Sequence, residues 1–221
     1  MSASPDTVAS PHTVSDVMTH TAVAVGRQAS YKQIVELMEQ WKVSALPVLE
    51  GEGRVIGVVS EADLLPKEEF RFDDPTRPTP SLSDAAKASA VSAEELMSSP
   101  AITVHASAAL AEAARIMARR RVKRLPVVND TGMLEGVVSR SDLLKVFLRP
   151  DEEIAEEIRH SVLPDLPIAA KIEVSVADGV VTVGGVLPEP RLEPLLARAV
   201  RAVEGVVGIR LDLSRRPTAS A

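Results

Sequence analysis

The sequence predicts a protein of the α+β (mixed α/β) class, built as a duplicated β-α-β-β-α unit followed by a smaller α-β-β-α-β unit. Three observations predict this class. A shift of 79 residues aligns segments 14–66 and 93–145 without a gap. Within each segment, apolar residues recur first at helical spacing and then in short runs typical of strands. After residue 150 the pattern changes, and apolar residues alternate with polar ones, which is typical of half-buried strands.

The duplication is densest around a Leu-Pro-Val sequence and the Gly-Val-Val-Ser sequence that follows it. The matching pairs are Met18 and Met97, Val25 and Val104, residues 46–48 and 125–127, residues 57–60 and 136–139, and Asp63 and Asp142. So many identities at one constant spacing indicate two copies of one structural unit.

Each copy predicts the same order of elements. A short strand is expected at 22–25 and again at 101–104. A helix follows, because apolar residues recur at i, i+3, i+4 and i+7. Ser30 and Ser107 stand where the N-cap of this helix is expected. Trp41 is in register with the apolar face of the first helix and is expected to pack in the core.

Two apolar runs with a Gly-containing segment between them then predict a hairpin in each copy. The runs are residues 46–49 and 55–59 in the first copy, and 125–128 and 134–138 in the second. A second helix is expected to start near Ser60 and near Ser139, each with an acidic residue in its first turn.

The combination of Leu-Pro-Val, a hairpin and Gly-Val-Val-Ser-x-x-Asp-Leu-Leu resembles the CBS domain family. Both copies carry it, so the resemblance covers most of residues 14–148. The resemblance implies a pseudo-twofold pair of repeats with two clefts between them. In many members these clefts bind adenosine-containing ligands, so the expected ligand is AMP, ADP, ATP, S-adenosylmethionine or NAD, and no cofactor is required.

By this resemblance, Ser60 and Asp63 would serve one cleft, and Ser139 and Asp142 the other. A carboxylate in the first turn of a helix can accept hydrogen bonds from both hydroxyls of a ribose. A hydroxyl and free backbone N–H groups at the helix start can meet a phosphate oxygen. The alternative is that the four residues only cap their helices and complement the helix dipole. The two roles are compatible.

The residues that precede Leu-Pro-Val differ between the copies. The second copy has five positive charges within residues 119–124, whereas the first copy reads Trp41-Lys42-Val43-Ser44-Ala45 before Leu-Pro-Val. By the resemblance this segment borders a cleft, so Lys123 and Arg124 are expected to contact phosphate, for which a guanidinium is well suited. Residues 119–121 are expected to be solvated charges at a helix end. The asymmetry predicts unequal clefts, one of them better suited to a polyphosphate.

The resemblance also places residues of the first strands and the prolines of Leu-Pro-Val at the clefts. The full set of residues expected to bind the adenosyl ligand is Thr21, Ala22, Val23, Ser44, Ala45, Pro47, Ser60, Asp63, Ala101, Ile102, Lys123, Arg124, Pro126, Ser139, Arg140 and Asp142. No catalytic residue and no metal ligand is expected.

The C-terminal unit has its own pattern. The expected elements are a helix over 151–162, strands over 172–176 and 180–183, a helix over 192–203 and a strand over 209–213. Asp178-Gly179 predicts a tight turn, with positive φ at Gly179, and Gly205 is expected to end the second helix. The Asp-Gly-Val-Val-Thr-Val sequence and the later Glu-Gly-Val-Val resemble the BON domain over residues 151–214. That resemblance implies a small interaction module that binds a protein partner or phospholipid.

The expected organisation is therefore a series of segments with distinct roles. They are a flexible N-terminus (1–13), the first CBS repeat (14–66), an exposed linker (67–92), the second CBS repeat (93–148), the BON-like domain (151–214) and a flexible tail (215–221). The linker contains several prolines and predicts a helix near residues 83–90.

Composition narrows the classes of function. A net charge of −6 and an aromatic content of 2% disfavour nucleic-acid binding. The absence of cysteine excludes disulfides and cysteine nucleophiles. The sequence contains no phosphate-binding glycine motif and no nucleophile–base pattern, which disfavours an enzyme. No run approaches the roughly 20 apolar residues of a membrane span. Residues 1–13 lack the features of a signal peptide, which favours the cytoplasm.

The sequence therefore predicts a cytoplasmic, non-enzymatic sensor of bacterial type. An adenosine-containing ligand in the CBS clefts would act through homodimerisation or through the BON-like domain. The alternative is a dimerising scaffold that binds no ligand and whose BON-like domain binds a protein partner or phospholipid.

Overall fold

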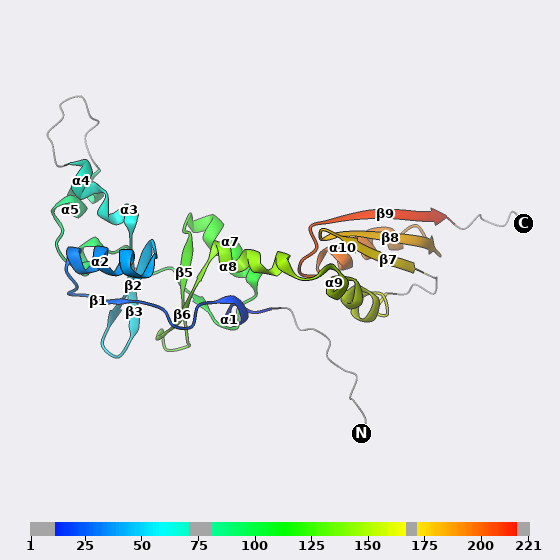
Figure 1. Cartoon of the computed structure of the whole chain (residues 1–221), viewed down its shortest axis with the longest axis horizontal. Coiled ribbons are helices and arrows are strands. Elements are labelled where there is room, and N and C mark those ends of the chain that lie inside the picture. The colour runs from blue at the N-terminus through cyan, green and yellow to red at the C-terminus, as the bar shows by residue number, and fades with distance from the viewer. Residues whose placement is uncertain (1–11, 71–80, 167–171, 216–221) are drawn as a thin grey trace, which may run out of the picture. The chain divides into compact units, whose positions relative to one another are not determined.

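A computed structural model describes residues 12–70, 81–166 and 172–215 of the chain (Figure 1). Its contacts divide these residues into a unit from His12 to Leu143 and a unit that starts at Leu144. Both units combine helices with three-stranded sheets that contain parallel and antiparallel pairs, which confirms the α+β class. The expectations of a flexible N-terminus and of a flexible tail fall largely outside the described residues.

The first unit consists of two repeats of one sheet each, with an insert between them. The first repeat has α1 (Val14–Val17), β1 (Val25–Gly26), α2 (Tyr31–Trp41), β2 (Ala45–Glu50), β3 (Arg54–Ser60) and α3 (Glu61–Leu64). The second has α6 (Ala93–Leu96), β4 (Val104–His105), α7 (Leu110–Arg120), β5 (Arg124–Val128), β6 (Leu134–Ser139) and α8 (Arg140–Leu144). In each sheet a parallel pair is followed by an antiparallel hairpin, with a register shift at Val48/Leu49 and at the equivalent Val127/Val128.

Each repeat completes the other by exchanging its N-terminal segment. The backbone of Thr19 pairs with Val137, and its equivalent Ser98 pairs with Val58. Helix α6 of the second repeat places Ala93 and Leu96 in the core of the first, where both are fully buried. The backbone pairing therefore repeats the 79-residue spacing of the sequence, as a pseudo-twofold pair requires.

Glycines allow the close approach of the exchanged segments. A Cβ at Gly57 would lie 2.4 Å from the sulfur of Met97. At the equivalent Gly136 it would lie 2.7 Å from the carbonyl oxygen of Thr19. Real Cβ atoms do not approach other atoms so closely, so both positions require glycine for space. Neither requires it for backbone conformation, since neither φ is positive.

Short helices begin both repeats, and the sequence analysis does not predict them. Thr13 precedes α1, and its backbone N and hydroxyl donate to the Asp16 carboxylate at 2.6 and 2.9 Å. The equivalent Ser92 precedes α6, and its backbone N donates to Glu95 at 3.1 Å. These capping contacts are local, so the Thr-x-x-Asp and Ser-x-x-Glu spacing is the signal that could have predicted both helices. The strands expected at 22–25 and 101–104 are only two residues long and lie at Val25–Gly26 and Val104–His105.

Two further expectations about the helices are wrong. Ala109, and not Ser107, occupies the N-cap position of α7. Ala109 is equivalent to Ser30, whose hydroxyl does cap α2 at 3.3 Å from the Gln33 nitrogen. Trp41 is 53% exposed and does not pack in the core. It is the last residue of α2, and the last buried residue of this helix is Met38.

The insert between the repeats contains α4 (Pro66–Glu69) and α5 (Leu82–Ser89), which lie beside α3 (Figure 1). Helix α5 covers the region where the sequence predicts one. The ammonium of Lys67 on α4 donates to the carbonyl of Ala88 at 2.8 Å and lies 5.4 Å from the centre of the Tyr31 ring. These contacts hold the end of the insert against the first repeat.

The C-terminal unit packs its helices on one sheet of order β7-β8-β9. It contains η1 (Lys145–Leu148), α9 (Asp151–Glu157), η2 (Ile158–Val162), β7 (Ile172–Ala177), β8 (Val180–Leu187), α10 (Leu192–Arg201) and β9 (Gly208–Arg215). Asp178 and Gly179 have φ of 51° and 71°, and both of their backbone nitrogens donate to Asp151 at 2.8 Å. Gly205 does not end the helix as expected, since α10 stops at Arg201; a Cβ at Gly205 would lie 2.8 Å from Ile154.

Candidate functional site

A cavity of about 250 Å³ opens between the two repeats, and both contribute to its lining. The first repeat provides Ser44, Ala45, Val58, Ser60, Glu61, Ala62 and Asp63. The second provides Ser98, Pro100, Ile102, Arg121, Val122, Lys123 and Arg124. We call this cavity the first cleft. The second cleft is the site that the pseudo-symmetry predicts around Ser139 and Asp142.

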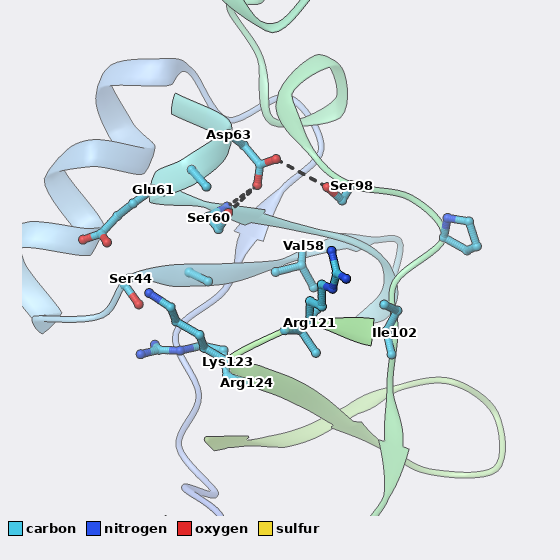
Figure 2. A pocket seen from close by; sticks show the side chains of 14 residues that line it. Ser44, Val58, Ser60, Glu61, Asp63, Ser98, Ile102, Arg121, Lys123 and Arg124 are labelled. Carbon is cyan, nitrogen blue, oxygen red and sulfur yellow. Dashed lines mark hydrogen bonds between the residues drawn. The ribbon is translucent and has the colours of Figure 1, made fainter. Parts of the chain in front are cut away.

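Asp63 is the buried polar group of the first cleft, with 7% of its surface exposed. It lies at the third position of α3, where one carboxylate oxygen accepts hydrogen bonds from Ser60 N at 2.8 Å and Ser60 Oγ at 2.6 Å. Its other oxygen accepts a bond from Ser98 Oγ at 3.4 Å (Figure 2). Asp63 therefore caps its own helix and also connects the repeats.

The second oxygen of Asp63 has a further partner that comes from the insert. The ammonium of Lys87, on α5, donates to Asp63 Oδ1 and forms an ion pair with it. The side chains of Lys87 and Asp63 are 18% and 9% exposed. No sequence motif indicates this contact, because the two residues come from the insert and from the repeat.

The second repeat has the same capping geometry. Asp142 Oδ2 accepts hydrogen bonds from Ser139 N at 2.9 Å and Ser139 Oγ at 2.5 Å. The two repeats thus share the Ser-x-x-Asp cap, and Lys87 reaches the cap of the first repeat.

Cations from the second repeat form the opposite side of the first cleft. Arg121 has a left-handed conformation with φ of 57° at the end of α7, and Lys123 and Arg124 follow it into β5. Figure 2 shows Lys123 and Arg124 across the pocket from Asp63. The Arg124 Nε is buried and, among the described residues, has no hydrogen-bond partner. A buried donor without a partner favours an acceptor supplied by a ligand or water.

Arg140 holds the basic segment in place. Its backbone nitrogen donates to the carbonyl of Lys123 at 3.0 Å, and its guanidinium donates to the carbonyl of Val122 at 3.1 Å. Arg140 was expected to contact ligand, and here it contacts the segment that lines the first cleft.

The structure brings seven of the sixteen expected ligand-binding residues to the first cleft. They are Ser44, Ala45, Ser60, Asp63, Ile102, Lys123 and Arg124. The other nine lie outside its lining, and among them Pro47 and Pro126 lie within β2 and β5, opposite Val58 and Val137. The binding roles of all sixteen stay predictions.

Several lining residues are absent from the sequence-based set. Arg121 is exposed at the end of α7, as expected, and it also lines the cavity. Ser98 lines the cavity because the N-terminal segment of the second repeat crosses to the first, and Pro100 lies in the segment 100–102 that the resemblance already places at a cleft. Their signal was the repeat itself, since Ser98 and Pro100 are equivalent to Thr19 and Thr21, and Thr21 was among the expected residues.

The described residues contain no cluster of three or more His, Asp or Glu side chains that could hold a metal ion. Within the same part of the chain, no helix has the length and apolar character needed to cross a membrane.

Comparison with known protein families assigns both units. A family model of the CBS domain matches residues 14–67 and 93–149. The chain belongs to the CBS domain family. A model of the BON domain matches residues 150–217, so a BON domain follows the CBS pair. Both resemblances drawn from the sequence are confirmed.

Similar proteins match mainly the CBS pair. An uncharacterized protein of Methanocaldococcus jannaschii, MJ1426, is 26% identical over an alignment of 133 residues, and the match covers 52% of this chain and 79% of that protein. The chloroplastic CBS domain-containing protein CBSX2 of Arabidopsis thaliana is 28% identical over 157 residues, 64% of this chain and 66% of CBSX2. The chain thus spans slightly less than two thirds of the length of CBSX2.

Two solved structures share the fold of the pair. A crystal structure of CBSX2 in complex with AMP has a TM-score of 0.54 at 28% identity and covers 62% of this chain and 97% of that one. The CBS domain pair of MJ0100, in complex with 5-methylthioadenosine and S-adenosyl-L-methionine, has a TM-score of 0.51 at 18% identity, with coverage of 62% and 97%. At 18% identity this second likeness supports the fold alone.

Proposed function

We propose that the CBS pair binds an adenosine-containing ligand and that the protein is a non-enzymatic regulatory sensor. One observation carries the proposal: a cavity between the repeats has a Ser-x-x-Asp helix start on one side and three cations on the other. The carboxylate of Asp63 would accept hydrogen bonds from ribose hydroxyls, while Lys123 and Arg124 would contact phosphate.

The relatives support this assignment at the level of ligand class. CBSX2 is 28% identical and was crystallised with AMP. Here Arg124 lines the same cavity as Asp63, and its buried Nε has no protein partner among the described residues. A ligand with a phosphate at one end and a ribose diol in its middle would satisfy both groups.

Regulation would follow from a difference in ligand affinity between two arrangements of the repeats, since a ligand shifts an equilibrium only by that difference. The N-terminal segment of each repeat pairs with the other repeat. A ligand that contacts both repeats would therefore stabilise one arrangement of the two repeats over another. We propose that the response is read through homodimerisation, or through a protein or phospholipid partner of the BON domain, in the cytoplasm.

A second candidate function is a dimerising scaffold that binds no ligand, and one observation favours it. Asp63 already accepts bonds from Ser60, Ser98 and Lys87. A carboxylate with about four acceptor positions is then close to saturated within the protein.

Isothermal titration of the full chain with AMP, ATP, S-adenosylmethionine and NAD tests the proposal. We expect saturable binding that Asp63→Ala and Asp142→Ala each weaken at one site by about tenfold or more, since hydrogen bonds to charged groups are worth about 1.5–3 kcal/mol. Asp130→Ala is the matched control, because this carboxylate is fully exposed and lies outside the first cleft. No heat with any of the four compounds would favour the scaffold.

A further inference from the structure

A charged side chain from the described part of the insert reaches the Ser-x-x-Asp cap of the first repeat. Lys87 lies near the end of α5 and pairs with Asp63, 24 residues earlier in the chain. Both side chains are largely withdrawn from water. A pair in such surroundings is screened less than a surface pair, so its charges affect other groups in the cavity.

The charges that line the first cleft make this contact important. Three cations (Arg121, Lys123 and Arg124) and two carboxylates (Glu61 and Asp63) line it. Lys87 is not part of the lining, and it approaches Asp63 at the oxygen that also contacts Ser98. Lys87 compensates the negative charge of Asp63 from outside the lining. The remaining charges of the lining are then three cations and one carboxylate, Glu61, so the first cleft carries a net positive charge.

We propose that Lys87 makes the first cleft selective for phosphate-bearing adenosine compounds over neutral and cationic ones. This inference rests on the proposed adenosyl-binding function and adds the class of ligand for one cleft. Lys87 acts through Asp63 as a positioning and charge-compensating residue. A phosphate dianion gains from each positive charge nearby, whereas the sulfonium of S-adenosylmethionine is repelled.

The same reasoning separates the two clefts. The insert that carries Lys87 packs beside α3 of the first repeat, and Lys87 pairs with Asp63. Selectivity that depends on Lys87 belongs to the first cleft alone.

The test compares AMP with adenosine, which share the base and the ribose and differ in the phosphate. Both are titrated at pH 8 into the full chain in an Asp142→Ala background, which restricts the comparison to the first cleft. We expect Lys87→Met to lower the affinity for AMP about tenfold, since one charge near a dianion is removed, and to change the affinity for adenosine much less. S-adenosylmethionine should bind at least as well as before, and Lys87→Arg should keep the preference for AMP.

Two further variants distinguish charge from structure. Lys67→Met removes the other insert lysine, whose ammonium contacts the Ala88 carbonyl, and should leave the ratio of AMP to adenosine affinity unchanged. The double variant Asp63→Asn/Lys87→Met removes both charges of the pair. This double variant should lower the affinities for AMP and for adenosine by similar factors. The ratio of the two affinities should then return toward that of the parent protein.

If Lys87→Met lowers the affinities for AMP and adenosine by the same factor, so that their ratio is unchanged, the inference is overturned and the proposed function stays intact. Absence of binding by all three compounds to every variant would overturn the proposed function, and the inference with it. If Lys87→Met alone fails to fold, Asp63→Asn is compared with the double variant. The single variant, which keeps Lys87, must then show the stronger preference for AMP.

Discussion

The two CBS repeats can be compared position by position, because a shift of 79 residues relates their backbone contacts as well as their sequences. Lys42 and Arg121 end equivalent helices in the same left-handed conformation. At the next equivalent positions, however, Ser44 and Ala45 in the first repeat correspond to Lys123 and Arg124 in the second. The duplication keeps the residues that build the fold and the Ser-x-x-Asp caps, while the two residues before Leu-Pro-Val have diverged.

The insert adds a second difference between the repeats. It follows the first repeat, and its helix α5 brings Lys87 to Asp63. Two copies of one fold therefore provide unequal chemical environments without any change in sheet register.

The largest effect is expected where the exchanged segments approach each other most closely. Gly136→Ala should destabilise the protein by about 1–3 kcal/mol, the usual range for overpacking, because its Cβ meets the backbone oxygen of Thr19. Gly57→Ala should cost less, since its Cβ meets the flexible side chain of Met97. Urea denaturation of both variants measures the difference.

Gly26→Ala is the control for the glycine pair, because a Cβ there meets nothing within 4 Å. Its midpoint should stay close to that of the parent protein. If Gly136→Ala is no less stable than Gly26→Ala, the backbone approach of the N-terminal segment is not the constraint that we infer.

An intermediate effect is expected at the basic side of the first cleft. Arg124→Ala makes this position resemble its equivalent, Ala45, and should weaken AMP binding about tenfold through the loss of a charge-assisted contact. Arg119→Ala is the control, since Arg119 lies on α7 and outside the cavity lining. Equal AMP affinities of the two variants, measured by titration, would remove Arg124 from the phosphate site.

The smallest effect is expected at the capping carboxylates that begin the repeats, Asp16 and Glu95. Hydrogen bonds from Thr13 lower the pKa of Asp16 below 3.8, and those from the backbone of Val91 and Ser92 lower the pKa of Glu95 below 4.5. A depressed pKa stabilises the fold fully above these ordinary values, and the stabilisation is lost as pH falls through the lower, folded pKa.

Stability measured by urea denaturation should therefore decline as pH falls below about 4.5. Asp16→Asn and Glu95→Gln should each flatten part of this decline and lower the stability slightly at pH 7. A decline that neither variant changes would place the acid sensitivity elsewhere in the molecule.

Much of the fold could be predicted because its signals are local or repeated. The period of 79 residues located both repeats, and the Asp178-Gly179 turn located the hairpin of the BON domain. The short helices α1 and α6 were missed although their capping residues were visible. Trp41 was misplaced because helical periodicity gives the face of a residue and does not show where packing on the sheet ends.

The sequence by itself determined the duplication, the class of fold and the chemistry of the Ser-x-x-Asp caps, because these depend on residues close together in the chain. Only the tertiary structure decided that Arg121 lines the cavity, that Ser98 crosses to the first repeat and that Lys87 pairs with Asp63. Each of these facts joins residues from separate elements. Such contacts depend on how the helices and sheets pack, and packing leaves no periodic trace in the sequence.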